Sequence, residues 1–190
     1  MSRYARLYLL LSLVLCFFIP GLELLFLAWA VIDIFNHKKD YCLLRIKNNF
    51  TGISIFFLFF PFIVLTGFCG DSLLGEYTKQ DSIKRLQDPS SNLGIQFYLS
   101  VLVIAPIVEE FYFRKILLNE IWFHFGPFFA VFLSAIIFSA VHNNIYAFPI
   151  LFALGLSLGI VKLFSVNIIN SILCHSIFNL LMLYQIYHKG

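Results

Sequence analysis

The chain has 190 residues, of which 61% are hydrophobic and only 12% are charged, whereas soluble domains carry about 25% charged residues. A formal net charge of +3 gives no support for nucleic-acid binding, and the four cysteines lack CxxC spacing, so neither a zinc ribbon nor a redox dithiol is expected. With a mean hydropathy of +0.90, the composition predicts an integral membrane protein. Its spans should be α-helices, because lipid offers backbone groups no other hydrogen-bond partner.

Long apolar segments, without the alternating polarity of a β-barrel, follow one another along the chain. The first of them contains Pro20 and Gly21, so it could form one kinked helix, which we favour, or a re-entrant hairpin. Since a span needs about 20 apolar residues, the pattern predicts an all-α, polytopic transmembrane bundle of about six spans. The segments are residues 7–35, 50–68, 93–113, 128–141, 146–164 and 166–187.

Two polar linkers divide the first half of the chain. The linker 36–49 is basic and is expected at the cytoplasmic face by the positive-inside rule. The linker 71–92 ends in a turn-forming Asp-Pro-Ser-Ser-Asn run and is expected on the opposite side. We therefore divide the chain into N-terminal membrane segments and loops, residues 1–92, and a helical core, residues 93–187.

One core segment contains a small-residue step formed by Gly155 and Gly159. Small residues at this spacing let two helices approach closely. Packing inside the bundle is a more economical explanation than dimerisation, and the oligomeric state is not predicted.

Three charged side chains, Glu109, Glu110 and Arg114, follow an uncharged apolar stretch. A charge deep in a bilayer costs at least about 2.5–3.5 kcal/mol, so such a group needs partners and often has a function. Glu110 and Arg114 are four residues apart with the acid first, which favours a helical ion pair and predicts a structural clamp. Glu109 lies about 100° further round the helix and is expected to face a cavity as a base. Taken alone, the three could also be interfacial anchors.

Two further polar pairs, Phe138/His142 and His175/Asn179, also have a spacing of four residues and therefore share a helix face. His175 and Asn179 lie in the middle of an apolar segment, where polar groups are costly unless they face the bundle interior. Their N–H groups could hold the oxyanion of a tetrahedral intermediate. His124, by contrast, is expected in a loop without such a partner.

The order EExxxR, FxxxH and HxxxN on successive apolar segments resembles the CPBP family, the CAAX-protease and bacteriocin-processing intramembrane proteases, also called Abi proteins. The resemblance covers about residues 93–184. It implies an all-helical intramembrane endopeptidase that needs no cofactor and has its active site inside the bundle near the cytoplasmic face. The expected location is a bacterial cell membrane, and the expected partners are the lipid bilayer and a protein or peptide substrate.

The resemblance also implies roles for individual residues. Glu109 and His142 would activate a water molecule that hydrolyses a peptide bond. His175 and Asn179 would stabilise the oxyanion. The residues that would support this site are Glu110, Arg114 and Phe138.

Two alternatives use the same residues differently. In a zinc metalloprotease, Glu109, His142 and His175 would bind the metal and a water would take the open position. We favour the metal-free glutamic type. In the other alternative, the chain is a non-catalytic bacteriocin-immunity or scaffold protein of the membrane. The sequence does not identify the substrate.

Overall fold

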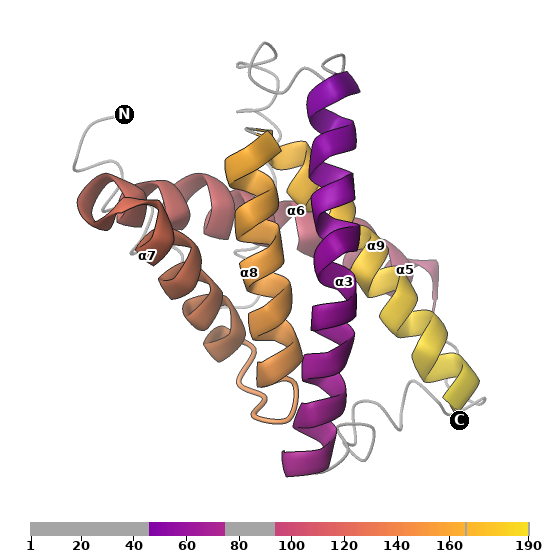
Figure 1. The fold of residues 1–190 in the computed structure, drawn as a ribbon. Coiled ribbons are helices and arrows are strands. Elements are labelled where there is room, and N and C mark those ends of the chain that lie inside the picture. Colours follow the sequence, from indigo (N-terminus) through magenta and orange to yellow (C-terminus); the bar gives the residue numbers. More distant parts are fainter. Residues whose placement is uncertain (1–45, 75–93, 166, 190) are drawn as a thin grey trace.

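The computed structural model describes residues 46–74, 94–165 and 167–189. Within these ranges every regular element is helical, which confirms the all-α prediction (Figure 1). The elements are α3 (Ile46–Leu74), α5 (Ile95–Leu99), the π-helical η2 (Ser100–Ile104), α6 (Ala105–Glu110), the π-helical η3 (Phe111–Leu117), α7 (Leu118–Val141), α8 (Phe148–Ser165) and α9 (Ile168–Lys189).

Four helical stretches in the described part of the chain are long and apolar enough to cross a membrane. A helical membrane bundle therefore fits, whereas the expected number of about six spans is not confirmed. The segment 7–35, with its choice between kinked helix and hairpin, lies outside the described residues, as does most of both linkers. The helix α3 is longer than the predicted segment 50–68, since it takes in the last residues of one linker and the first of the next.

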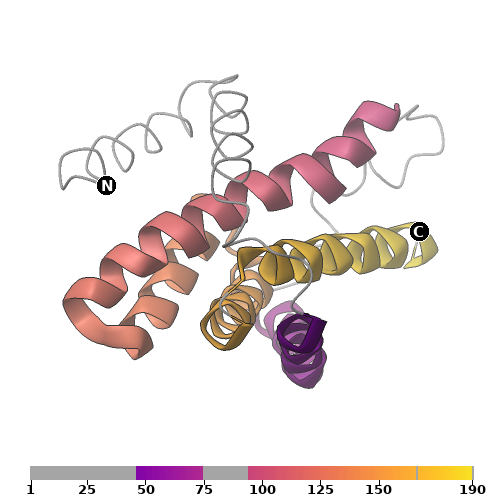
Figure 2. The same ribbon diagram turned by 90° about the horizontal axis from the view of Figure 1, so that it is seen from above.

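The longest helical stretch, Ile95–Val141, has 47 residues. At about 1.5 Å per residue it is much longer than a bilayer is thick, so it cannot be one straight span. It bends at Gly126, which has φ 82° and ψ 172°, and Figure 2 shows the chain turning back there. The two predicted segments 93–113 and 128–141 are thus separate arms.

The predicted loop around His124 is wrong. The first arm stays helical up to the bend, because the first backbone conformation that departs from the helix is that of Gly126, with φ 82°. His124 consequently has a partner one turn back, with its Nε2 3.4 Å from Glu120 Oε1.

The helix α8 lies between α3 and the second arm of α7 (Figure 1). Two glycines allow the close approach to α7. A Cβ added at Gly155 would lie 3.0 Å from both Cα and Cβ of Ala135, and one at Gly159 would lie 3.1 Å from a methyl group of Val131. The small-residue step thus serves packing inside the bundle, as the sequence predicts.

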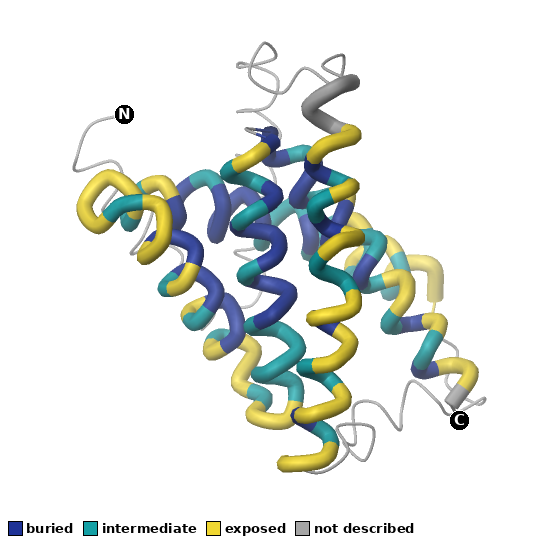
Figure 3. Tube along the Cα trace, in the orientation of Figure 1, coloured by how far each residue is buried: buried dark blue, intermediate teal, exposed yellow. Residues whose placement is uncertain are grey.

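Burial is greatest in α8, in η3 and along the inner side of α7, whereas much of α3 faces outward (Figure 3). The large apolar side chains that α3 exposes, such as Phe57 and Leu58, suit contact with lipid. The main hydrophobic cluster contains Phe113 and Phe138, which places the aromatic residue of the second motif in the centre of the core.

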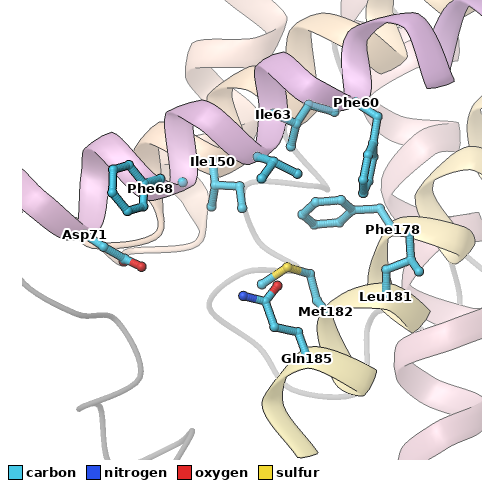
Figure 4. A pocket seen from close by; sticks show the side chains of 11 residues that line it. Phe60, Ile63, Phe68, Asp71, Ile150, Phe178, Leu181, Met182 and Gln185 are labelled. Carbon is cyan, nitrogen blue, oxygen red and sulfur yellow. The ribbon is translucent and has the colours of Figure 1, made fainter. Parts of the chain in front are cut away.

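A cavity of about 180 Å³ lies between α3, α8 and α9 (Figure 4). Its lining is mostly apolar, with two polar side chains, and it contains none of the predicted catalytic residues. The predicted catalytic residues therefore lie outside this cavity. Lining residues include Phe60, Ile63, Phe178, Met182, Asp71 and Gln185.

Candidate active site

The predicted clamp forms at the junction of α6 and η3. Glu110 and Arg114 are both fully buried, and Arg114 Nε lies 3.2 Å from Glu110 Oε2. The guanidinium carbon also lies 5.2 Å from the ring centre of Phe138. A desolvated cation over an aromatic face is stabilised by about 2 kcal/mol or more. The arginine is therefore held by a carboxylate and by the aromatic residue of the second motif.

His175 joins the clamp from α9. Its Nδ1 lies 3.1 Å from Glu110 Oε1, and its side chain is only 4% exposed. A carboxylate can only accept, so Nδ1 carries a hydrogen and donates a hydrogen bond to Glu110. Both oxygens of Glu110 thus have a cationic or N–H neighbour, and Nε2 of His175 points away from the clamp.

His142 is held in the same way at the end of α7. Its Nδ1 lies 2.7 Å from the carbonyl oxygen of Phe138, four residues earlier. Because a carbonyl oxygen only accepts, Nδ1 is the donor, and in the neutral form of such a ring Nε2 keeps its lone pair. The chain leaves the helix at once, since Asn143 has φ 48°.

Glu109 lies between the two histidines. Its Oε2 is 3.8 Å from Nε2 of His142 and 3.8 Å from Nε2 of His175. This atom is covered, and within the described part of the chain it has no hydrogen-bond partner. A separation of 3.8 Å is too long for a direct hydrogen bond. It suits a carboxylate and an imidazole that both bind one small molecule or ion between them. Glu109 and His142 are 26% and 31% exposed, so the group is accessible on their side and closed at the clamp.

Phe138 explains why an aromatic residue precedes His142 by one turn. Its fully buried ring lies 4.8 Å from the ring centre of His142 and 5.8 Å from that of His175, in addition to its contact with Arg114. One side chain therefore restricts the positions of three polar groups from three different helical elements.

Asn179 is placed differently from the other motif residues. Its Nδ2 donates a hydrogen bond of 2.9 Å to the carbonyl oxygen of Val101 in η2. Sequence reasoning did not find this acceptor, because a backbone carbonyl belongs to no residue type. One residue in the sequence could have indicated a free carbonyl group here. Pro106 lies five residues after Val101, and proline has no N–H to donate to a carbonyl of the preceding helical turn.

In the described part of the chain, no three His, Cys, Asp or Glu side chains form a group arranged to hold a metal ion. Ligands about 2.1 Å from a tetrahedral zinc ion are about 3.4 Å apart. Glu109 Oε2 would therefore have to move a few tenths of an ångström toward each histidine to serve as a ligand with them. The zinc alternative needs this closure.

Comparison with known proteins gives one family. Residues 91–181 match the family model described as type II CAAX prenyl endopeptidase Rce1-like. The matched region contains all seven residues of the three motifs. No curated protein and no solved structure matches the chain.

Proposed function

Through residues 91–181 the chain belongs to the type II CAAX prenyl endopeptidase Rce1-like family of intramembrane proteases, and we propose that Glu109 and His142 activate the water that cleaves its substrate. The observation that carries this proposal is the separation of 3.8 Å between Glu109 Oε2 and His142 Nε2. With Nδ1 of His142 donating to Phe138, Nε2 of a neutral ring is an acceptor, as the carboxylate oxygen is. A water oxygen about 2.8 Å from each atom would see them at an angle of roughly 85°, so its two O–H groups can point at both.

The chemical step follows from this placement. The water oxygen attacks the carbonyl carbon of the peptide bond and gives its proton to Glu109. The carbonyl oxygen becomes an oxyanion, and the intermediate collapses when the C–N bond breaks and Glu109 returns the proton to the leaving amine. A correctly placed general base contributes about 10²- to 10⁴-fold to such a reaction.

His175 and Asn179 are the proposed donors to the oxyanion. Nδ1 of His175 is already used by Glu110, so donation to the oxyanion requires a proton on Nε2 as well. A proton at that position would face Glu109, whose Oε2 lies 3.8 Å from Nε2.

The zinc mechanism is the second candidate, and one observation favours it. Nδ1 of each histidine is held by an oxygen, from Phe138 in one case and Glu110 in the other. Metal-binding histidines are usually oriented in this way, with the second ring nitrogen directed at the metal. Glu109, His142 and His175 would be the ligands.

Cleavage by the detergent-purified full chain tests these proposals. The substrates are quenched peptides that end in a CAAX-type sequence, with and without an S-prenyl group, together with a library of apolar peptides. The variants are Glu109→Gln and a matched control, Glu120→Gln, which removes a carboxylate that pairs with His124 outside the motifs. Each protein is assayed with and without chelator.

We expect Glu109→Gln to lower kcat about 10²- to 10⁴-fold, with Glu120→Gln close to wild type and no effect of chelator. Loss of activity with chelator and recovery with zinc would instead assign Glu109 and the histidines as ligands. Equal activity of Glu109→Gln and wild type would refute both mechanisms. Cleavage of prenylated peptides alone would define the substrate class, whereas cleavage of both forms would exclude a requirement for the lipid.

A further inference from the structure

The helix that carries the glutamates is widened just before them. The amide of Ala105 donates to the carbonyl of Ser100, five residues earlier, which is the π-helical pattern of η2. Pro106 is the second residue of α6. A proline ring collides with the carbonyl four residues earlier and offers no N–H, and a local π-helical turn is one way in which a membrane helix accommodates a proline.

This arrangement removes both helical partners of one carbonyl group. In α-helical register the carbonyl of Val101 would accept from the amide of Ala105, but that amide donates to Ser100. In π-helical register it would accept from residue 106, which is proline and has no amide hydrogen. Inside a membrane, an unsatisfied backbone group costs several kcal/mol. Asn179 supplies the missing donor at 2.9 Å.

We propose that Pro106 is a positioning residue that releases the carbonyl of Val101 so that it can hold the side chain of Asn179. An amide side chain could face its surroundings with either its oxygen or its nitrogen. A carbonyl acceptor selects the nitrogen, and therefore sets the direction of the whole group. One N–H of Asn179 is used in this bond, and the second is the donor that oxyanion stabilisation requires. Only this last step rests on the proposed function.

A stability cycle tests the link without any need for turnover. The full chain is unfolded by titration with denaturing detergent in mixed micelles as wild type, Pro106→Ala, Asn179→Ala and the double variant. In wild type, Asn179→Ala leaves the carbonyl of Val101 without a donor. With alanine at position 106 the backbone can satisfy that carbonyl, so the same substitution should cost less.

The expected coupling is about threefold to twentyfold in the unfolding equilibrium constant, the range of side-chain hydrogen bonds in membrane proteins. The control cycle replaces Pro106→Ala with Pro61→Ala, which removes a proline from the interior of α3, and should be additive with Asn179→Ala. An equal cost of Asn179→Ala in the wild-type and Pro106→Ala proteins would overturn the proposal. This outcome is independent of whether the protein cleaves any peptide.

The kinetic readout separates positioning from a general loss of structure. With a substrate identified as above, Pro106→Ala should lower kcat and leave KM near the wild-type value, because Asn179 acts on the oxyanion and not on the bound substrate. The double variant should be no slower than Asn179→Ala alone. If the two losses multiply, Pro106 does not act through Asn179.

Discussion

The buried ion pair allows a prediction whose magnitude follows from the structure. Arg114→Met removes one charge but keeps a long apolar side chain in the same space. It takes away the contact of 3.2 Å with Glu110 and the cation that lies 5.2 Å from the ring centre of Phe138. Both partners of the pair are fully buried, so Glu110 loses its counter-ion and keeps the hydrogen bond from Nδ1 of His175. Breaking such a pair costs about 3–5 kcal/mol of unfolding free energy.

The second substitution separates loss of charge balance from loss of packing. Glu110→Gln in the Arg114→Met protein removes the stranded charge, and the amide oxygen of glutamine can still accept from Nδ1 of His175. We expect the double variant to recover most of the lost stability, because replacing both members of a buried pair is often nearly neutral. The unfolding free energy is measured by denaturing-detergent titration in mixed micelles, with helix content followed by circular dichroism.

Lys115→Met is the matched control, since it removes the neighbouring cation at a position that is only partly buried. Its expected cost is about 1 kcal/mol or less. The reasoning is refuted if Arg114→Met costs no more than Lys115→Met, or if Glu110→Gln makes the Arg114→Met protein less stable still.

Two backbone predictions use the same titration. Gly155→Ala should lower the unfolding free energy by about 1–3 kcal/mol, because its Cβ would lie 3.0 Å from the backbone of Ala135. Gly159→Ala should lower it less, since the added Cβ meets a methyl group of Val131 that can move. Equal losses for the two variants would contradict this packing. Gly126→Ala should cost about 1–3 kcal/mol from conformation alone. Gly126 has φ 82°, and apart from its chain neighbours no atom of the described residues lies within 4 Å of the position a Cβ would take. An unchanged stability would show that the bend does not need this backbone conformation.

Helix periodicity was sufficient to predict the local part of the site. A spacing of four residues places two side chains on one helix face, and the pair Glu110–Arg114 forms as that rule requires. The same rule placed Phe138 beside His142. These contacts lie within single helices, so they depend on backbone geometry that every helix shares.

Contacts between helices could not be predicted in this way. Nothing in the spacing indicates that the guanidinium of Arg114 lies against Phe138, or that His175 binds Glu110 and not Glu109. These partners depend on how α6, α7 and α9 are packed, and the family resemblance supplied the motif positions without their geometry. The roles of Glu109, His142, His175 and Asn179 in catalysis stay predictions.

The π-helical turns show why period alone was not enough. The glutamates lie on α6, which has only six residues and is bounded by η2 on one side and η3 on the other. A π-turn places one more residue in a turn than the α-helix does, and one residue corresponds to about 100° of rotation. If η2 were α-helical, the helix face that carries Glu109 and Glu110 would be rotated by about 100° relative to the preceding turns. Those preceding turns contain Val101, whose carbonyl oxygen accepts the hydrogen bond from Asn179. The direction of the carboxylates toward α9 therefore depends on the widened turn as well as on the EExxxR spacing.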